Sequence, residues 1–115
     1  MPLQVLEREE WCRDKDVWAG LIEGDRLGTG ISLLFEAAAD AGEGPPMHVH
    51  PYDEIHIVRS GQVRYVGDGT DMIVGPGDIV VVPAGTPHRL ETLGAAEALS
   101  VHLAPKMAME IVGNN

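Results

Sequence analysis

The sequence has little cysteine and few aromatic residues. Among its 115 residues there are one Cys, two Trp, two Tyr and one Phe. The single cysteine, Cys12, excludes an intramolecular disulfide and a cysteine-rich zinc site, and we interpret it as a small, partly buried residue. Because aromatic residues make up only 4% of the chain, the core is expected to consist mainly of aliphatic residues. Trp11, Trp18 and Phe35 are the large side chains expected to fill it.

Basic residues and long apolar runs are also scarce. Eight Lys and Arg stand against 18 Asp and Glu, which gives a formal net charge of −10. A surface with this charge repels nucleic acids and anionic lipids, so neither is an expected partner. The N-terminal stretch carries acids where a signal peptide has a basic region, and no stretch approaches the ~20 apolar residues of a membrane span. The sequence therefore predicts a cytoplasmic protein.

Glycine and proline divide the chain into short pieces. The 14 Gly and 8 Pro are spread over the whole length, a rhythm typical of an all-β sandwich or barrel. We expect residues 1–115 to form a single domain. Short helices are expected only at residues 14–20 and 105–113. Strands are expected in residues 29–37, 54–61, 62–77, 78–85, 88–94 and 97–104, with a hairpin turn rather than a calcium loop at residues 67–71.

Three of the five histidines lie within one short stretch, residues 44–61. In an extended chain, His48 and His50 point to the same side and can clamp a metal ion. His-x-His alone is also found on solvated strand faces. A returning strand can add the carboxylate of Glu54, which gives a facial set suited to Fe, Mn, Zn, Ni or Cu. His88, at the end of an apolar run, is the candidate for a fourth ligand, although a surface histidine at a strand start would look the same.

These residues resemble the two motifs of the cupin family. The first motif is Gly, five residues, His-x-His, three or four residues, Glu, six residues, Gly. It corresponds here to Gly42, His48, His50, Glu54 and Gly61, with every spacing met. The first motif therefore covers residues 42–61.

The second cupin motif covers residues 77–92. It is Gly, five residues, Pro-x-Gly, two residues, His, three residues, Asn. It corresponds to Gly77, Pro83, Gly85 and His88, followed by Thr92 in place of Asn. Because that position is not a ligand in the family, Thr92 is expected to have a structural role near the end of a strand.

The resemblance implies a fold, a ligand set and an assembly. It implies an all-β fold, the cupin jelly roll or double-stranded β-helix, with a metal in its mouth. It also implies that His48, His50, Glu54 and His88 bind one divalent transition-metal ion, which can be Fe, Mn, Ni, Zn or Cu. Small cupins often form homodimers, so a homodimer is expected, and an N-terminal strand in residues 2–7 is a candidate for exchange between subunits.

A second group of residues lies near the expected ligands. His56 follows Glu54 by two residues, so it should point into the barrel near the metal, and we assign it the catalytic role of acid, base or substrate-orienting group. A core histidine with satisfied nitrogens is the alternative. His102 would line the pocket if it faces inward and would be a surface histidine if it faces outward, and the surface position is favoured. Tyr52 could gate the mouth of the pocket, although a turn role is favoured. Either Arg64 or its neighbour in the strand, Tyr65, must face the pocket.

The functional hypothesis is a small metalloenzyme that acts on a small oxygen-rich or aromatic molecule. Dioxygenase-type oxidation is preferred, and isomerase or lyase and cyclase chemistry also fits an open site of three histidines and one glutamate. The alternative is a non-catalytic cupin that binds or senses a small molecule. A structural protein with an empty barrel is a third hypothesis. Fold does not decide among them, because function depends on the pocket.

Overall fold

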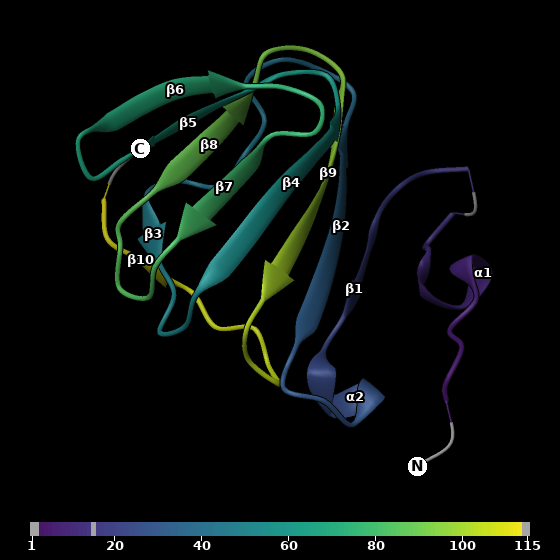
Figure 1. The fold of residues 1–115 in the computed structure, drawn as a ribbon. Helices are drawn as coiled ribbons and strands as arrows, with labels where there is room; N and C mark the ends of the chain where they lie inside the picture. Colours follow the sequence, from purple (N-terminus) through teal and green to yellow (C-terminus); the bar gives the residue numbers. More distant parts are fainter. Residues whose placement is uncertain (1–2, 15, 114–115) are drawn as a thin grey trace.

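The computed structural model describes residues 3–14 and 16–113, which consist mainly of β-strands. Ten strands and two single-turn helices are found in the described residues (Figure 1). The helices are α1 (Arg8–Trp11) and α2 (Gly24–Leu27). The strands are β1 (Gly20–Ile22), β2 (Ser32–Ala38), β3 (His48–Val49), β4 (Glu54–Ser60), β5 (Val63–Gly67), β6 (Thr70–Val74), β7 (Ile79–Val82), β8 (Arg89–Thr92), β9 (Ala96–His102) and β10 (Glu110–Ile111).

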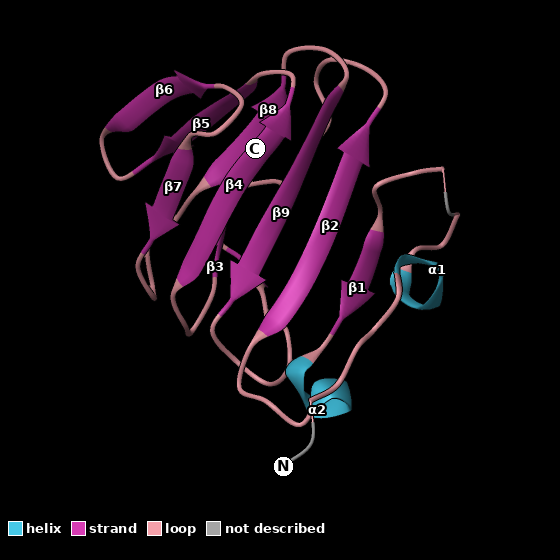
Figure 2. Ribbon diagram, turned by 45° about the vertical axis from the view of Figure 1, so that its right-hand side comes forward, coloured by secondary structure: helices cyan, strands magenta, loops and turns pink. Residues whose placement is uncertain are grey.

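The strands form two antiparallel layers that face each other (Figures 1 and 2). One layer is a five-stranded sheet in the order β1-β2-β9-β4-β7, and the other contains β6-β5-β8 and the pair β10-β3. Reciprocal backbone hydrogen bonds between His48 and His88, of 2.9 and 3.0 Å, join β3 to the start of β8. Two facing antiparallel layers of this kind form the double-stranded β-helix, so the predicted all-β jelly roll is confirmed.

The inward faces of β4 and β9 divide the interior into an apolar half and a polar half. Burial alternates along both strands, as expected for strands with one face on a core. Towards one end, the buried positions carry Val58, Ala96 and Ala98, which lie in or beside the core. Towards the other end, the buried side chains are polar: Glu54, His56, Ser100 and His102. The same alternation therefore builds the core and collects the candidate site.

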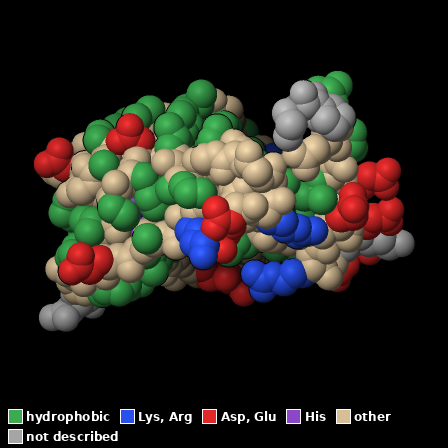
Figure 3. All heavy atoms as spheres, turned by 90° about the horizontal axis from the view of Figure 1, so that it is seen from below, with side chains coloured by type: hydrophobic (Ala, Val, Ile, Leu, Met, Phe, Trp, Pro, Cys, Tyr) green, Lys and Arg blue, Asp and Glu red, His purple; other side chains and the backbone are tan. Residues whose placement is uncertain are grey.

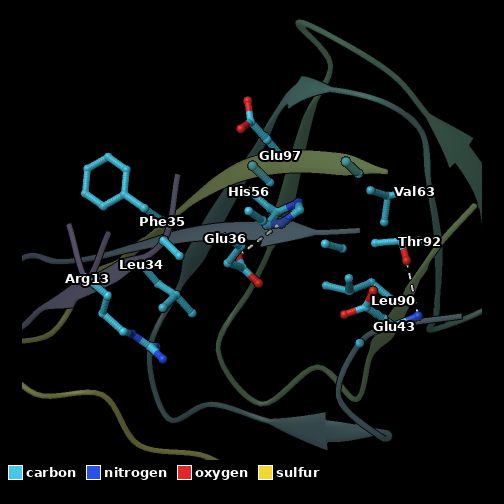
Figure 4. Close-up of a pocket in the computed structure, with 16 residues that line it drawn as sticks. Arg13, Leu34, Phe35, Glu36, Glu43, His56, Val63, Leu90, Thr92 and Glu97 are labelled. Atoms are coloured by element: carbon cyan, nitrogen blue, oxygen red, sulfur yellow. Dashed lines mark hydrogen bonds and ion pairs between the residues drawn. The ribbon is translucent and has the colours of Figure 1, made fainter. Parts of the chain in front are cut away.

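The three large aromatic residues pack together outside the barrel, so the expectation that they fill the core is wrong. Trp11 stacks on Phe35 with ring centroids 3.7 Å apart, and Trp18 meets Phe35 edge-on at 4.9 Å. The guanidinium of Arg59 lies over the Trp18 ring at 3.8 Å. Phe35 points away from the inward-facing Glu36 on β2 (Figure 4). Aliphatic side chains and Tyr65 are left to form the core between the sheets.

The helix predicted at residues 14–20 is wrong. The helical turn comes earlier, at α1, where Glu7 and Glu10 form a capping box: the backbone N–H of Glu7 donates to Glu10 Oε2 at 2.7 Å. Residue 15 lies outside the described residues, and the others from 14 to 20 form turns and the start of β1. Across the described ranges, no helix is long and apolar enough to cross a membrane.

The helix predicted at residues 105–113 is also wrong. This segment contains β10, which pairs antiparallel with β3 in the register Glu110↔Val49. The free edge of β3 offers backbone partners that a short exposed helix would not have, and pairing satisfies them. The C-terminal segment therefore covers the strand that carries the first histidine. In residues 3–7, where an exchanged strand was expected, no strand is found.

Two local features agree with the sequence. The turn between β5 and β6 has positive φ at both Asp68 (48°) and Gly69 (76°), which is typical of a tight hairpin turn. The Thr92 hydroxyl donates to the Asp40 carbonyl at 2.6 Å and accepts from the Glu43 N–H at 3.1 Å. Thr92 thus ties the end of β8 to the loop that leads to His48, which is the structural role expected of it.

Charged side chains are distributed over the surface without a basic stripe on the face shown in Figure 3. There, Lys and Arg side chains lie among acidic and uncharged ones.

Arg64 points out from β5 and forms ion pairs with Asp71 at 2.7 Å and Glu91 at 3.2 Å. Its neighbour Tyr65 is buried and faces the interior. The sequence left open whether Arg64 or Tyr65 faces the interior, and the inward residue is Tyr65.

Candidate metal centre

The first three candidate ligands come from a short strand and the bend that follows it. His48 lies in β3, and His50 is the first residue after this strand. The ring centroids of the two histidines are 4.8 Å apart. The bend after His50 returns the chain to Glu54, the first residue of β4. His50 Nε2 then lies 3.2 Å from Glu54 Oε1. All three side chains are buried, so a local stretch of seven residues brings two imidazoles and one carboxylate together.

The fourth candidate ligand comes from a distant part of the chain. His88 is held opposite His48 by the backbone bridge between the two residues, and their ring centroids lie 4.2 Å apart. Its Nε2 atom is 3.4 Å from Glu54 Oε1. The structure therefore brings together all four residues that the sequence singled out.

Backbone carbonyls fix the orientation of three imidazoles. Nδ1 lies 2.7 Å from the Pro46 oxygen in His48, 2.7 Å from the Ala108 oxygen in His50, and 2.8 Å from the Thr86 oxygen in His88. A carbonyl oxygen can only accept, so each Nδ1 carries the hydrogen. In the neutral ring, Nε2 then presents a lone pair to the centre of the site. Such partners are typical of histidines that bind metals.

Two buried atoms of the candidate ligands lack hydrogen-bond partners among the described residues. They are Glu54 Oε1 and His88 Nε2. Leaving such groups unpaired is costly. The ligand atoms of His48, His50 and His88 lie within 4.8 Å of one another, and so do those of His50, Glu54 and His102. Converging lone pairs and a carboxylate are what a divalent cation would satisfy, so the residues fit a metal ion.

His102 is the site residue whose orientation the sequence left open. The favoured surface position is wrong: His102 is 2% exposed, and its Nε2 lies 3.7 Å from Glu54 Oε2. Its Nδ1 lies 2.8 Å from the hydroxyl of Tyr52, which is buried rather than serving only in a turn. The alternation of Ala98 and Ser100 on β9 could have revealed the inward position of His102.

The C-terminal segment that contains Ala108 forms hydrogen bonds to residues of the candidate metal centre. The Ala108 oxygen accepts from His50 Nδ1 at 2.7 Å and from the Tyr52 hydroxyl at 3.2 Å. The Ala108 N–H also lies 3.2 Å from that hydroxyl. Ala108 thus positions His50 directly and His102 through Tyr52. No sequence motif identifies Ala108, because its role depends on the pairing of β10 with β3.

His56 points into the barrel as predicted, but its neighbours are not the candidate ligands. Its side chain is 1% exposed, and Nε2 lies 3.4 Å from Glu36 Oε1 on β2. Its ring centroid is 5.2 Å from that of Tyr65, whose ring is stacked at 6.4 Å on His88. His56 also lines a cavity of about 380 Å³ (Figure 4). It therefore stands between this cavity and the candidate metal centre.

Two pKa values in the centre move apart. Burial by itself would lower the pKa of His50, but Glu54 and the Ala108 carbonyl raise it above 6.5. Burial by itself would raise the pKa of Glu54, yet His50 and His88 at hydrogen-bonding range, together with His102, hold it far below 4.5. In the metal-free protein at pH values below the raised pKa of His50, a proton on Nε2 takes the place that a metal ion would occupy.

We expect metal binding to strengthen as the pH rises, because the ion displaces this proton. The raised pKa of His50 stabilises the metal-free fold below about pH 6.5, and this contribution is lost as the pH rises through that pKa. The lowered pKa of Glu54 stabilises the fold above about pH 4.5, and that contribution is lost only as the pH falls towards its folded pKa. The increase in Tm on adding Zn²⁺ should therefore be larger above pH 6.5 than below it. A gain that is independent of pH would contradict this expectation.

Comparisons with known proteins agree with the fold and the motifs. A family model described as "Cupin domain" matches residues 27–102. Dimethylsulfoniopropionate lyase DddQ of Ruegeria pomeroyi is 28% identical over 65% of this chain and 48% of its own length. The chain thus spans about half the length of this curated relative. The crystal structure of DddQ matches with a TM-score of 0.64 and 27% identity, over 72% of this chain and 43% of that one.

A solved structure of similar size shows the same architecture. An uncharacterized conserved protein with a double-stranded beta-helix domain from Klebsiella pneumoniae matches with a TM-score of 0.72 over 96% of this chain and 93% of its own. At 19% identity, this likeness shows the fold alone. The family model, in contrast, covers well over half of the chain, from before the first motif to the end of β9. The chain therefore belongs to the cupin family.

Proposed function

We propose that this cupin is a small metalloenzyme in which His48, His50, Glu54 and His88 bind one divalent transition-metal ion. The observation that carries the proposal is the convergence of buried, unpaired ligand atoms on one centre. When bound, such an ion polarises an oxygen-bearing substrate or activates a bound water. The metal can be Fe, Mn, Ni, Zn or Cu, since histidine and carboxylate ligands suit all of them.

His56 is the residue proposed to act on the substrate. It lines the cavity and follows the ligand Glu54 by two residues on β4. Its two ring nitrogens have no hydrogen-bond partner within the described protein, so they are available to orient a bound molecule or to transfer a proton to or from it. Tyr65 separates the ring of His56 from that of His88, which keeps His56 out of the proposed ligand set.

Among the reaction classes that fit the site, we favour lyase chemistry. The relative DddQ is named as a lyase and is 28% identical, whereas the sequence alone suggested dioxygenase-type oxidation. A lyase needs a group that transfers a proton to or from the substrate, and His56 lines the cavity in which a substrate would lie. The homodimer expected from the resemblance to small cupins stays a prediction.

We expect His56→Ala to lower kcat by about 10²- to 10⁴-fold, the usual contribution of a proton-transferring residue. Metal content should stay close to that of the wild type, because His56 lies outside the proposed ligand set. The Tm should fall, because truncation of a buried side chain removes packing. The measurement is turnover of a panel of small carboxylates, sulfonium and amine compounds, sugar acids and phenols by metal-loaded protein, with oxygen uptake recorded in parallel.

The same panel separates the alternatives. Oxygen consumption with any substrate would replace the lyase proposal by the dioxygenase one. Binding without conversion by the wild type, with only an affinity change in His56→Ala, would assign the protein to the non-catalytic cupins that bind or sense small molecules. Loss of metal together with activity in His56→Ala would show that His56 belongs to the metal centre and would overturn its proposed role.

A further inference from the structure

A cavity of about 380 Å³ opens between the two sheets beside the candidate metal centre. This volume is in the range of small-molecule sites. Its walls are mainly aliphatic and come from both layers, with Leu34 on β2, Val63 on β5, Leu90 on β8 and Ala98 on β9 (Figure 4). A pocket of this kind excludes water from part of its volume, so the few polar groups in it decide what binds.

His56 is the most deeply buried polar group in this cavity. It is 1% exposed, and neither Nδ1 nor Nε2 has a hydrogen-bond partner among the described residues. A buried polar group without a partner is unusual in a native protein and costs about 1–3 kcal/mol. His56 thus lacks a partner that a bound molecule in the cavity can supply.

Glu36 places a carboxylate opposite His56. Its Oε1 accepts from the Ser100 hydroxyl at 2.6 Å and lies 3.4 Å from His56 Nε2. The side chain is 33% exposed, and its carboxylate lies beside the ring of His56 (Figure 4). A charged residue on the inward face of β2, next to Leu34, brings no advantage to an apolar core.

The charge of the lining is negative. Three carboxylates line the cavity, from Glu36, Glu43 and Glu97, against one guanidinium from Arg13. Glu97 lies 3.6 Å from Arg59, and Glu43 accepts the backbone N–H of Asp40 at 2.9 Å. Glu36 has no Arg or Lys partner within the described part of the chain. The inner end of the cavity therefore favours a positive ligand.

We infer that this cavity binds the ammonium group of a small organic amine between Glu36 and His56. The N–H groups of such a ligand donate to the carboxylate and to an imidazole nitrogen, while its carbon chain contacts Leu34 and Leu90. His56 lies two residues from Glu54 on β4, about 7 Å along the strand. The other end of the ligand can thus reach the metal, and this last step alone rests on the proposed function.

The test compares three molecules with the same carbon chain: n-butylamine, n-butanol and butyrate. Each is titrated into the full-length protein, both metal-free and Zn²⁺-loaded, with binding followed by NMR chemical shifts. We expect n-butylamine to bind at least tenfold more tightly than the other two. Its shifts should map to Leu34, Glu36, His56 and Leu90. Binding to the metal-free protein depends on the cavity alone. A failure of the proposed metal site can therefore be distinguished from a failure of the proposed amine site.

Matched variants make the result specific. Glu36→Gln keeps the shape of the side chain and should weaken n-butylamine at least tenfold, with the Tm and metal content confirming an intact fold. Glu91→Gln alters a carboxylate that pairs with Arg64 outside the cavity lining, and should bind n-butylamine like the wild type. Equal or tighter binding of butanol or butyrate, no binding of any of the three, or unchanged affinity in Glu36→Gln would overturn the inference.

Discussion

Replacement of Glu54 by glutamine is expected to lower the affinity for divalent metal by roughly 100-fold or more, since even residues that only support metal ligands contribute about 10- to 100-fold. Glu54 is the only anionic group among the four proposed ligands, and its oxygens lie 3.2 Å from His50 Nε2 and 3.4 Å from His88 Nε2. The glutamine side chain has the same shape. Without the carboxylate, the stabilisation that the lowered pKa of Glu54 contributes above about pH 4.5 is lost, so the metal-free variant should be less stable than the metal-free wild type.

Thermal unfolding with and without Zn²⁺ measures this effect. At a metal concentration of 100 times Kd, the wild type should gain about 2.7 kcal/mol, which corresponds to roughly 10 °C in Tm for a chain of this size. The Glu54→Gln variant should gain almost nothing under the same conditions. Glu91→Gln, which alters a carboxylate paired with Arg64 on the outside of β8, is the control and should respond like the wild type. An equal gain in all three proteins would contradict the assignment of Glu54.

Replacement of Gly61 by alanine is expected to destabilise the fold by more than about 3 kcal/mol, the largest effect on stability that we predict. Gly61 closes the first motif, between β4 and β5, with φ at 76°. A Cβ atom there would collide with the Ala95 carbonyl oxygen and would lie 2.8 Å from Ala96 Cα. Both are backbone atoms at the start of β9, so the strand that carries His102 would have to shift.

Gly69→Ala is a matched control for this variant. Gly69 also has φ at 76°, but a Cβ atom there meets nothing within 4 Å. Its cost should be about 1–2 kcal/mol, the usual penalty for a side chain in the left-handed region. Chemical denaturation of both variants gives the two free energies of unfolding. An equal loss of unfolding free energy in the two variants would show that the backbone conformation explains the glycine at position 61. The close approach to Ala95 would then have no part in it.

The parts predicted correctly from the sequence depend on local pattern. The turn residues and the alternation in β4 and β5 are visible within short windows, so the jelly roll and its strand positions follow from them. The cupin motifs add a spacing that ties His48, His50 and Glu54 to the distant His88. Glu54 lies on β4, where the alternation of burial also places Val58 in the core.

The parts that were missed depend on contacts between segments far apart in the chain. β10 forms because the edge of β3 needs a partner, and nothing within residues 105–113 shows this. Ala108 becomes a support for His50 only through that pairing. The position of His102 depends on the register of β9 against β4, where it lies opposite Glu54. Trp11 and Trp18 join Phe35 on the outer face of β2 for the same reason: their partners are set by the fold.

The central claim is that four side chains from two motifs bind one metal ion. Anomalous diffraction from crystals of Zn²⁺-loaded protein, recorded on both sides of the zinc edge, tests it most directly. We predict one peak per chain, at about 2.0–2.2 Å from Nε2 of His48, His50 and His88 and from a carboxylate oxygen of Glu54. Absence of a peak from this centre, or a peak bound by other residues, would contradict the account.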